Sequence, residues 1–349
     1  MLMQTTARPP APADEEQLED LLSAPLDGVG ADLAALGGDV VLLGAGGKIG
    51  PTMTVMAKRA LEEAGSSATV HAVSRWSEVD VRESLEQKGI RTHSAELGDP
   101  SAYAALPDAA GVFYLAAMKF GTTGAEHRMW WTNAAVPALV ASRYRGVPTV
   151  VYSSGNVYPF TPLARGGCTE QDAPGPLGEY AQSCLARERV FAGASERWGT
   201  PSLMFRLNYA CELRYGVIAD IAARIADGRP VDVTMPAVNV VWQRDVSAWA
   251  LRGILLADPS APVLNATGPE TIPVRRIASL LGEAMGREVE FTGTEASDAL
   301  LNDAGDCFAR FGYPSLAART LIDWTADWIG AGGRRLGKAT KFEQRQGRY

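Results

Sequence analysis

The sequence has few of the residues that build metal and disulfide sites. Its 349 residues include 4 cysteines and 3 histidines. The cysteines lie far apart without a Cys-x-x-Cys pair, and the histidines form no His-x-x-x-His spacing, which argues against a local zinc site or a disulfide framework. We therefore expect no bound metal and a reducing, cytoplasmic setting.

Positive charge and long apolar runs are scarce as well. The 33 Lys and Arg residues stand against 40 Asp and Glu, so the net charge is −7, which disfavours broad binding to nucleic acid. No segment has the roughly 18 consecutive apolar residues of a membrane span. The N-terminus is Pro-rich and then acidic, unlike a secretion signal. We expect neither nucleic acid nor a membrane as a partner.

The chain is instead built from short apolar runs that alternate with longer amphipathic segments. Unbroken apolar strands separated by helices are typical of a parallel sheet buried on both faces. We predict the α/β class, with a Rossmann-like doubly wound parallel sheet and a smaller C-terminal substrate lobe interleaved with the last strands. The expected strands are Val40–Leu43, Thr69–Val73, Val112–Leu115, Thr149–Tyr152 and Leu203–Phe205, and the expected helices include about 50–64, 134–145 and 180–197.

This pattern divides the chain into four parts. We expect an N-terminal leader and helix over 1–38, an NAD(P)-binding Rossmann domain over 39–210, the substrate lobe over 211–330 and a basic arm over 331–349. Residues 1–14 look like a loose leader, before apolar residues at helical spacing. The arm is most simply a solvated charge run. Its charged residues are Arg334, Arg335, Lys338, Lys341, Arg345 and Arg348 against Glu343.

A glycine loop follows the first apolar run directly and precedes a predicted helix. Gly44 suits a tight turn, Gly47 lets the backbone approach a pyrophosphate, and Gly50 lets the helix pack closely on the strand. The helix N-terminus adds free N–H groups for phosphates. We predict a dinucleotide cofactor at this loop. Its expected contacts are Gly44, Gly46, Gly47, Lys48, Ile49 and Gly50.

The second strand indicates which dinucleotide binds. A cofactor with a free ribose 2′-OH is usually held by an acidic residue at the end of this strand. Here the strand ends in Ser74-Arg75, and an arginine can pair with a 2′-phosphate. Lys48 adds a second positive charge. We therefore favour NADP over NAD. The alternative is that Arg75 is a surface arginine and the cofactor is NAD.

Further motifs follow in a characteristic order. The third strand region ends in Glu96-Leu97-Gly98-Asp99, the fourth strand in Leu115-Ala116-Ala117, and the fifth in Ser153-Ser154-Gly155-Asn156. The next helix opens with Tyr180-Ala181-Gln182-Ser183-Cys184, and Arg206-Leu207-Asn208-Tyr209 follows the sixth strand. With the glycine loop, this set resembles the extended short-chain dehydrogenase/reductases, often called NAD-dependent epimerase/dehydratases, over residues 39–290.

The resemblance implies roles for individual residues. In that family a Ser or Thr hydrogen-bonds the substrate oxygen and a Tyr acts as acid or base toward it, which by motif are Ser154 and Tyr180. The resemblance also implies cofactor contacts at Tyr180 and the strand ends, namely Ser74, Arg75, Glu96, Leu97, Leu115, Ala116 and Ala117. Substrate contacts are expected at Lys119, Ser154, Gly155, Asn156 and Asn208.

One family residue is missing. The Tyr-x-x-Ser-Lys-x-x-x-Glu pattern matches at Ser183 and Glu188, but position 184 is Cys. A free tyrosine has a pKa near 10 and needs a nearby cation to move protons efficiently near neutrality. We take Lys119, after the fourth strand, as the replacement and third catalytic residue. Arg187 is the other candidate, with a solvated surface position as its simplest interpretation.

These features predict an enzyme. The resemblance implies an NAD(P)-dependent oxidoreductase or epimerase that acts on a hydroxyl or ketone of a sugar-like substrate, and a homodimer formed through the helices near 134–145 and 180–197. The alternative is a non-catalytic NAD(P)-binding redox sensor or scaffold that lost the lysine. The sequence leaves the substrate and the choice between epimerase and dehydrogenase open.

Overall fold

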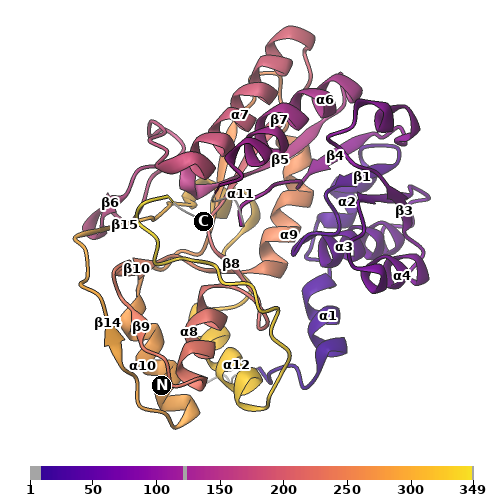
Figure 1. The fold of residues 1–349 in the computed structure, drawn as a ribbon. Helices are drawn as coiled ribbons and strands as arrows, with labels where there is room; N and C mark the ends of the chain where they lie inside the picture. Colours follow the sequence, from indigo (N-terminus) through magenta and orange to yellow (C-terminus); the bar gives the residue numbers. More distant parts are fainter. Residues whose placement is uncertain (1–8, 121–123, 348–349) are drawn as a thin grey trace, which may run out of the picture.

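A seven-stranded parallel sheet forms the centre of the molecule (Figure 1). The computed structural model describes residues 9–120 and 124–347. The strand order is β12-β7-β5-β4-β1-β2-β3, and every neighbouring pair is parallel. This confirms the predicted doubly wound sheet. The strands are β1 (Val40–Leu43), β2 (Val70–Ser74), β3 (Arg91–Ser94), β4 (Gly111–Tyr114), β5 (Thr149–Ser154), β7 (Ser202–Leu207) and β12 (Val263–Ala266).

Side chains alternate across the sheet and build a core on each face. Val40 and Leu42 of β1 lie in one cluster of buried residues, and Val41 and Leu43 lie in another. This is the two-residue period of a strand buried on both faces. The helices over the first face are α2 (Val29–Ala34), α3 (Gly50–Glu63), α4 (Val79–Gln87) and α9 (Gln243–Arg252), and those over the second are α6 (Val136–Arg143) and α7 (Gly178–Trp198).

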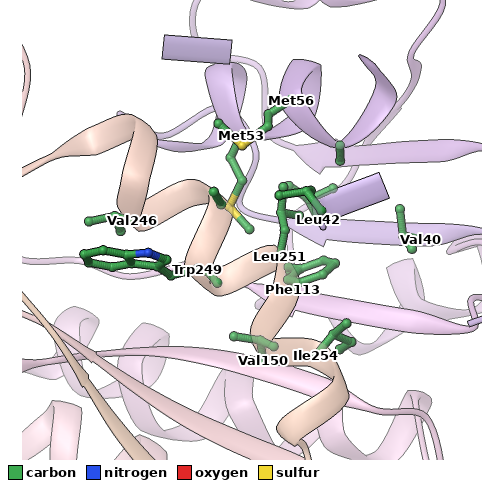
Figure 2. Packing of buried hydrophobic residues seen from close by; sticks show 14 of the residues in the cluster. Val40, Leu42, Met53, Met56, Phe113, Val150, Val246, Trp249, Leu251 and Ile254 are labelled. Atoms are coloured by element: carbon green, nitrogen blue, oxygen red, sulfur yellow. The ribbon is translucent and has the colours of Figure 1, made fainter. Parts of the chain in front are cut away.

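The first-face core is centred on α9 (Figure 2). Trp249 of this helix is fully buried and packs with Val246, Met53 of α3 and Phe113 of β4. In sequence, α9 follows the first segments of the smaller lobe that is described below, yet α9 packs on the sheet. After α9 the chain adds strand β12 to the sheet and then enters the smaller lobe a second time. The observed order is therefore the interleaving that the sequence predicts.

The smaller lobe is a bundle of helices with short strand pairs. Its core contains buried residues from α8 (Val217–Ala226), α10 (Val274–Met285) and α12 (Ala318–Gly330). The Trp242 and Trp324 rings meet edge to face, 6.0 Å apart. The remaining elements are α5 (Glu126–Trp130), α11 (Gly305–Phe311), β6 (Thr161–Pro162), β8 (Ala210–Cys211), β9 (Val231–Asp232), β10 (Ala237–Val238), β11 (Val241–Trp242), β13 (Ile272–Pro273), β14 (Phe291–Thr292) and β15 (Asp298–Ala299).

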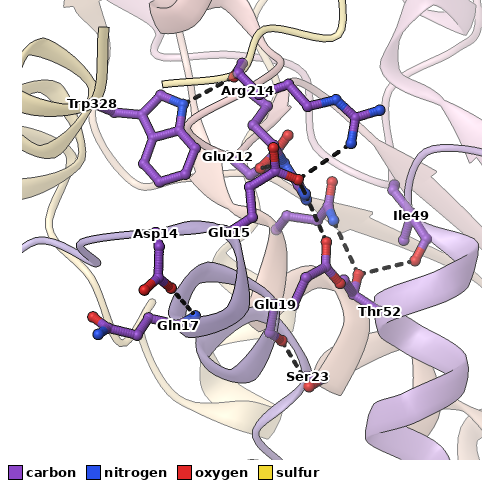
Figure 3. Close-up of polar contacts among 12 residues, drawn as sticks. Asp14, Glu15, Gln17, Glu19, Ser23, Ile49, Thr52, Glu212, Arg214 and Trp328 are labelled. Carbon is purple, nitrogen blue, oxygen red and sulfur yellow. Dashed lines mark hydrogen bonds and ion pairs between the residues drawn. The ribbon is translucent and has the colours of Figure 1, made fainter. Parts of the chain in front are cut away.

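The N-terminal segment is part of the lobe core. Helix α1 (Glu15–Ser23) buries Leu18 and Leu22 completely in the lobe. Figure 3 shows its carboxylates around Arg214, which lies 2.7 Å from Glu19. The indole of Trp324 donates to the Pro9 carbonyl at 3.0 Å. The expectation of a loose leader is therefore wrong for residues 9–14, because they pack on α12, and residues 1–8 lie outside the described part.

None of the helices formed by the described residues combines the length and the apolar character that crossing a membrane requires.

Docking of α1 on the lobe predicts a stability effect. Leu22→Ala should lower the free energy of unfolding by about 2–5 kcal/mol, because it removes a fully buried side chain and leaves a cavity. Chemical denaturation measures this change. Val79→Ala is the control, since Val79 is exposed and should shift stability by no more than about 0.5 kcal/mol. An equally small effect at Leu22 would contradict the docking of α1.

Candidate active site

The glycine loop joins β1 to α3 at the carboxyl edge of the sheet. Gly44 has φ +90°, which favours glycine, and a Cβ there would lie 2.6 Å from the Ala116 nitrogen. A Cβ on Gly50 would lie 2.3 Å from the Ala45 carbonyl oxygen. At Gly47 the nearest atom would be 3.4 Å away, an ordinary contact. Gly44 therefore fits the predicted tight turn, Gly47 leaves the predicted room for a pyrophosphate to approach the main chain, and Gly50 fits the predicted close packing of helix on strand.

The loop also fits a dinucleotide electrostatically. The first N–H groups of α3 have no partner within the helix, so they suit phosphate oxygens. The Lys48 ammonium lies 3.3 Å from the Tyr215 ring centroid and has no hydrogen-bond acceptor among the described residues. Burial lowers the pKa of Lys48 to about 7. An anion beside Lys48 would supply the missing acceptor.

The end of β2 forms the next part of this edge. A Cβ on Gly46 would lie 2.5 Å from the Ser74 hydroxyl and 3.6 Å from the Trp76 ring. Arg75 is 75% exposed and pairs with Glu96, 3.5 Å away. Ser74 therefore lies against the glycine loop as predicted, whereas the Arg75 charge faces solvent beside a carboxylate.

The end of β4 reaches the same edge. The Leu115 N–H donates to the Leu43 carbonyl at 2.8 Å, and Ala116 touches Gly44. Asn133 is fully buried and pins the Met118 main chain, because its side chain bonds both the N–H, at 2.8 Å, and the carbonyl, at 2.9 Å. These bonds hold the segment that carries Lys119 beside the glycine loop.

Ser154 and Tyr180 meet at the carboxyl end of β5. Ser154 is the last residue of β5 and Tyr180 lies in the first turn of α7. Burial raises the pKa of Tyr180 well above its usual value, while Arg187 and the Ser154 side chain act in the opposite direction. Ser154 therefore lies close enough to Tyr180 to influence its ionisation. The structure thus brings together the two groups that the motif predicts.

Two cations lie close to Tyr180. The Lys119 ammonium lies 5.2 Å from the Tyr180 ring centroid, and burial lowers the pKa of Lys119 to about 8. Arg187 is only 2% exposed and donates from Nη1 to the Tyr152 carbonyl at 2.7 Å. The expectation that Arg187 is a solvated surface cation is wrong, because α7 packs this face against β5.

Cys184, at the position of the family lysine, is a packed thiol. It is fully buried and lies in the same buried cluster as Tyr180. Burial raises the pKa of the Cys184 thiol, and the nearby Arg187 opposes this. A buried neutral thiol is inert as a nucleophile.

The predicted substrate contacts surround Ser154. The Ser154 hydroxyl donates to the Asn156 amide oxygen at 2.9 Å. A Cβ on Gly155 would lie 2.9 Å from the Cβ of Asn208 and 2.6 Å from the Asn302 amide oxygen. Asn302 is buried and neither of its side-chain polar atoms has a partner among the described residues. Asn208 is also buried and lies against Gly155.

The C-terminal arm crosses from the lobe to the site. Figure 1 shows the yellow tail leaving α12 and ending near the centre of the molecule. The Thr340 N–H donates to Asp220 at 2.6 Å, Phe342 is buried, and Gly347 touches Gly178 at the start of α7. The expectation of a solvated arm is therefore wrong for residues 340–347, which pack on the molecule, whereas Arg334, Arg335 and Lys338 are exposed as expected.

The arm brings positive charge to the crevice edge. Lys338 lies 3.7 Å from Glu78, which precedes α4. Lys338 is close enough to help lower the pKa of Lys48, after burial and Lys119, and Lys341 does the same to Lys119, after burial. Lys48 and Lys119 thus form a lysine cluster with Lys338 and Lys341 of the arm, which are close enough to influence their pKa values, while Asp220 acts in the opposite direction on Lys48.

No protein-family model and no curated protein sequence matches the chain. Solved structures match it, each aligned over 84% of this chain and 99% of the other chain. A UDP-glucuronic acid 4-epimerase from Bacillus cereus, in complex with NAD and a UDP-sugar, has 15% identity and a TM-score of 0.71. A UDP-glucose 4-epimerase from Thermotoga maritima with UDP-glucose has 18% and 0.66, and a UDP-galactose 4-epimerase has 20% and 0.67.

The chain has the fold of these epimerases. This confirms the fold that its motifs predict, including the glycine loop at the carboxyl edge between β1 and α3.

Sequence reasoning missed three features of the site. Trp76 has φ +54°, donates its indole N–H to the His93 carbonyl at 2.9 Å and forms a wall beside Gly46. Lys338 and Lys341 reach the site only through the path of the arm. The sequence gives no sign that Arg187 is buried, since the same helix also carries exposed arginines. Of the three features, only Trp76 could have been found from the sequence, because an aromatic residue directly follows Ser74-Arg75.

The close packing at Gly50 generates a prediction. Gly50→Ala should destabilise the protein by about 1–3 kcal/mol, because the added methyl group meets main-chain atoms that cannot rotate away. Gly193→Ala is the matched control. Gly193 lies in α7 with open space around its Cβ, so alanine there should stabilise by about 0.5–1 kcal/mol. Thermal unfolding of both variants measures the difference, and equal effects would refute the close packing.

Proposed function

We propose that the protein is an NAD(P)-dependent oxidoreductase or epimerase of the extended short-chain type, acting on a hydroxyl or ketone of a sugar-like substrate. The observation that carries this proposal is the placement of Ser154, the last residue of β5, and Tyr180, in the first turn of α7, at the same sheet edge as the glycine loop. A serine and a tyrosine directed at one point, beside a dinucleotide-type loop, can act together on a carbinol or carbonyl oxygen.

The residues divide the chemical work between them. A bound nicotinamide dinucleotide supplies a hydride acceptor or donor. Tyr180 takes the proton from the substrate hydroxyl, or returns it to the ketone oxygen, while the Ser154 hydroxyl hydrogen-bonds that oxygen and stabilises its developing charge. Gly155, Asn156 and Asn208 shape the substrate side of this pair.

The lysine cluster supports an anionic substrate. Lys48 and Lys119 both face the Phe120 ring, at 4.6 Å and 5.5 Å from its centroid, and Lys338 and Lys341 approach from the arm. Such a cluster suits a phosphate or diphosphate. The structurally similar epimerases act on UDP-sugars, so a nucleotide-linked sugar is the substrate class we propose. Lys119 would contact this substrate from the crevice side as the third catalytic residue.

The cofactor we propose is NADP, with NAD as the alternative. Gly44, Gly46, Gly47, Lys48, Ile49 and Gly50 would hold the pyrophosphate half. Ser74, Arg75, Glu96 and Leu97 would border the adenosine half, and Leu115, Ala116, Ala117 and Tyr180 the nicotinamide half. The exposed Arg75–Glu96 pair is weak, so Arg75 can exchange the carboxylate for a 2′-phosphate. The 4-epimerase from Bacillus cereus was solved with NAD, which makes the cofactor choice worth a direct test.

The first test removes the reacting hydroxyls. Tyr180→Phe and Ser154→Ala should each lower kcat by about 10²–10⁴-fold, because they remove proton transfer and stabilisation of the substrate oxygen. Cofactor affinity, measured by fluorescence titration with reduced nucleotide, should stay within about twofold of wild type for Ser154→Ala. UDP-sugars are the first substrates to assay, with product inversion and net cofactor reduction followed separately. Inversion without net reduction identifies an epimerase.

The same assays examine the sensor alternative. A non-catalytic dinucleotide-binding protein would bind cofactor tightly, turn over no sugar in a broad screen, and show no difference between wild type and Tyr180→Phe. That set of results would exclude the enzyme.

A second test concerns the cofactor. Arg75→Ala should weaken NADPH binding about tenfold and leave NADH binding nearly unchanged, because only the 2′-phosphate depends on the guanidinium. Glu96→Gln is the complementary variant, since removal of the competing carboxylate should strengthen NADPH binding. If wild type binds NADH more tightly than NADPH, and Arg75→Ala changes neither, the preference for NADP is refuted.

The homodimer and the cytoplasmic setting stay predictions. Helices α6 and α7, which the resemblance assigns to a dimer interface, lie side by side over one face of the sheet.

A further inference from the structure

Arg187 is a buried cation with spare hydrogen-bond donors. Its side chain is 2% exposed and one nitrogen, Nη1, donates to the Tyr152 carbonyl. The other two nitrogens, Nε and Nη2, are buried and have no partner among the described residues. The guanidinium carbon lies 5.7 Å from the Tyr114 ring centroid. No carboxylate of the described residues forms an ion pair with it.

Burying the Arg187 charge without a carboxylate partner does not stabilise the fold. Taking a charge out of water costs several kcal/mol unless a partner compensates for it. The adjacent Glu188 does not compensate, because it pairs bidentately with Arg206, at 2.9 Å and 2.6 Å. A hydrophobic side chain of similar length would be cheaper to bury at position 187. The charge therefore points to a role beyond packing.

The groups around Tyr180 show where that charge acts. On α7 they are Cys184 and Arg187, on β5 Ser154, and after β4 Lys119. The next layer contains Tyr114 of β4 and the closed Glu188–Arg206 pair. Arg187 opposes the effect of burial on the pKa of both Tyr180 and Cys184, whereas Lys119 opposes it on Cys184.

Building on the function proposed above, we propose that Arg187 replaces the missing lysine of the Tyr-x-x-x-Lys pattern. It would act from the side of α7 that faces β5, as a positioning residue that stabilises the tyrosinate form of Tyr180. Cys184 removes the long side chain at the lysine position, and Arg187 supplies the charge from the following helical turn. No contact between Arg187 and substrate is required.

Lys119 is less suited to this task. Its ammonium faces the Tyr180 ring, and its pKa is lowered to about 8 by burial. Lys119 therefore loses its charge as the pH rises into the range where a tyrosinate is needed. An arginine stays protonated throughout this range. Lys119 remains on the crevice side, where it would meet the ligand.

The experiment reads the ionisation of Tyr180 directly. Tyrosine labelled at the phenol carbon Cζ gives an NMR signal that moves on ionisation, and the signal absent from Tyr180→Phe identifies Tyr180. The titration is run on the binary complex with oxidised cofactor, so it needs no substrate. In Arg187→Met the midpoint should lie about one pH unit or more above wild type. Arg189→Met, which alters an exposed arginine of the same helix, should leave it in place.

Two further variants separate charge from structure. Arg187→Met should melt at the wild-type temperature or above, because it removes a buried charge. Cys184→Lys combined with Arg187→Met should bring the midpoint back toward the wild-type value. Equal midpoints in wild type and Arg187→Met would overturn the inference. So would a shift in Lys119→Met without one in Arg187→Met, or an unchanged Tyr180 signal over the whole range in which wild type is folded.

The readout also separates this inference from the proposed function. If the protein binds no dinucleotide, the proposed function fails, and the same titration on the free protein still compares Arg187→Met with wild type. If cofactor binds and turnover occurs while the two midpoints agree, only the inference about Arg187 fails.

Discussion

The ion pair between Glu188 and Arg206 holds the site together. It joins α7 to β7 through two short bonds, and the Ser153 hydroxyl of β5 donates to the same carboxylate. All three side chains are buried. Breaking one partner of a buried pair leaves an uncompensated charge, which is strongly destabilising. The pair therefore fixes the rotation and height of α7 over the sheet.

That fixed rotation determines what the rest of α7 can do. Glu188 points to β7, and Tyr180, two turns earlier on the same helix, is brought to the end of β5 beside Ser154. Residue 187 is rotated by about 100° from residue 188, so its side chain enters the space next to Tyr114 and Tyr152. Because Arg206 pairs with Glu188, Arg187 forms no ion pair with a carboxylate in the part of the chain that the structure describes. The Glu188–Arg206 pair and the absence of an ion pair at Arg187 among the described residues both follow from this placement of α7.

The sequence predicts the parts of the site that depend on local geometry. Gly50 approaches Ala45 within one strand-loop-helix unit and Gly44 has a positive φ in the same unit, so the glycine spacing finds them. Ser154 lies at the end of an apolar run, where the motif of the resembled family predicts it. Burial of Arg187 depends on which face of α7 meets β5, and an arginine in a helix carries no mark of that. The arm residues Thr340 and Phe342 pack on elements more than 100 residues away, such as Asp220, which no local pattern encodes.

The acidic composition of the chain does not describe the charge at the site. The average charge of −7 disfavours polyanions as partners, yet the fold collects Lys48, Lys119, Lys338 and Lys341 at one edge. Burial, and to a smaller extent repulsion from neighbouring ammoniums, lowers the pKa of Lys48 and of Lys119, which is a cost to the ligand-free protein. A phosphate or diphosphate ligand, as proposed above, would offset that cost by pairing with them. The arm is tied to Asp220 on one side and to the start of α7 on the other, so one segment joins these lysines to the helix that carries Tyr180.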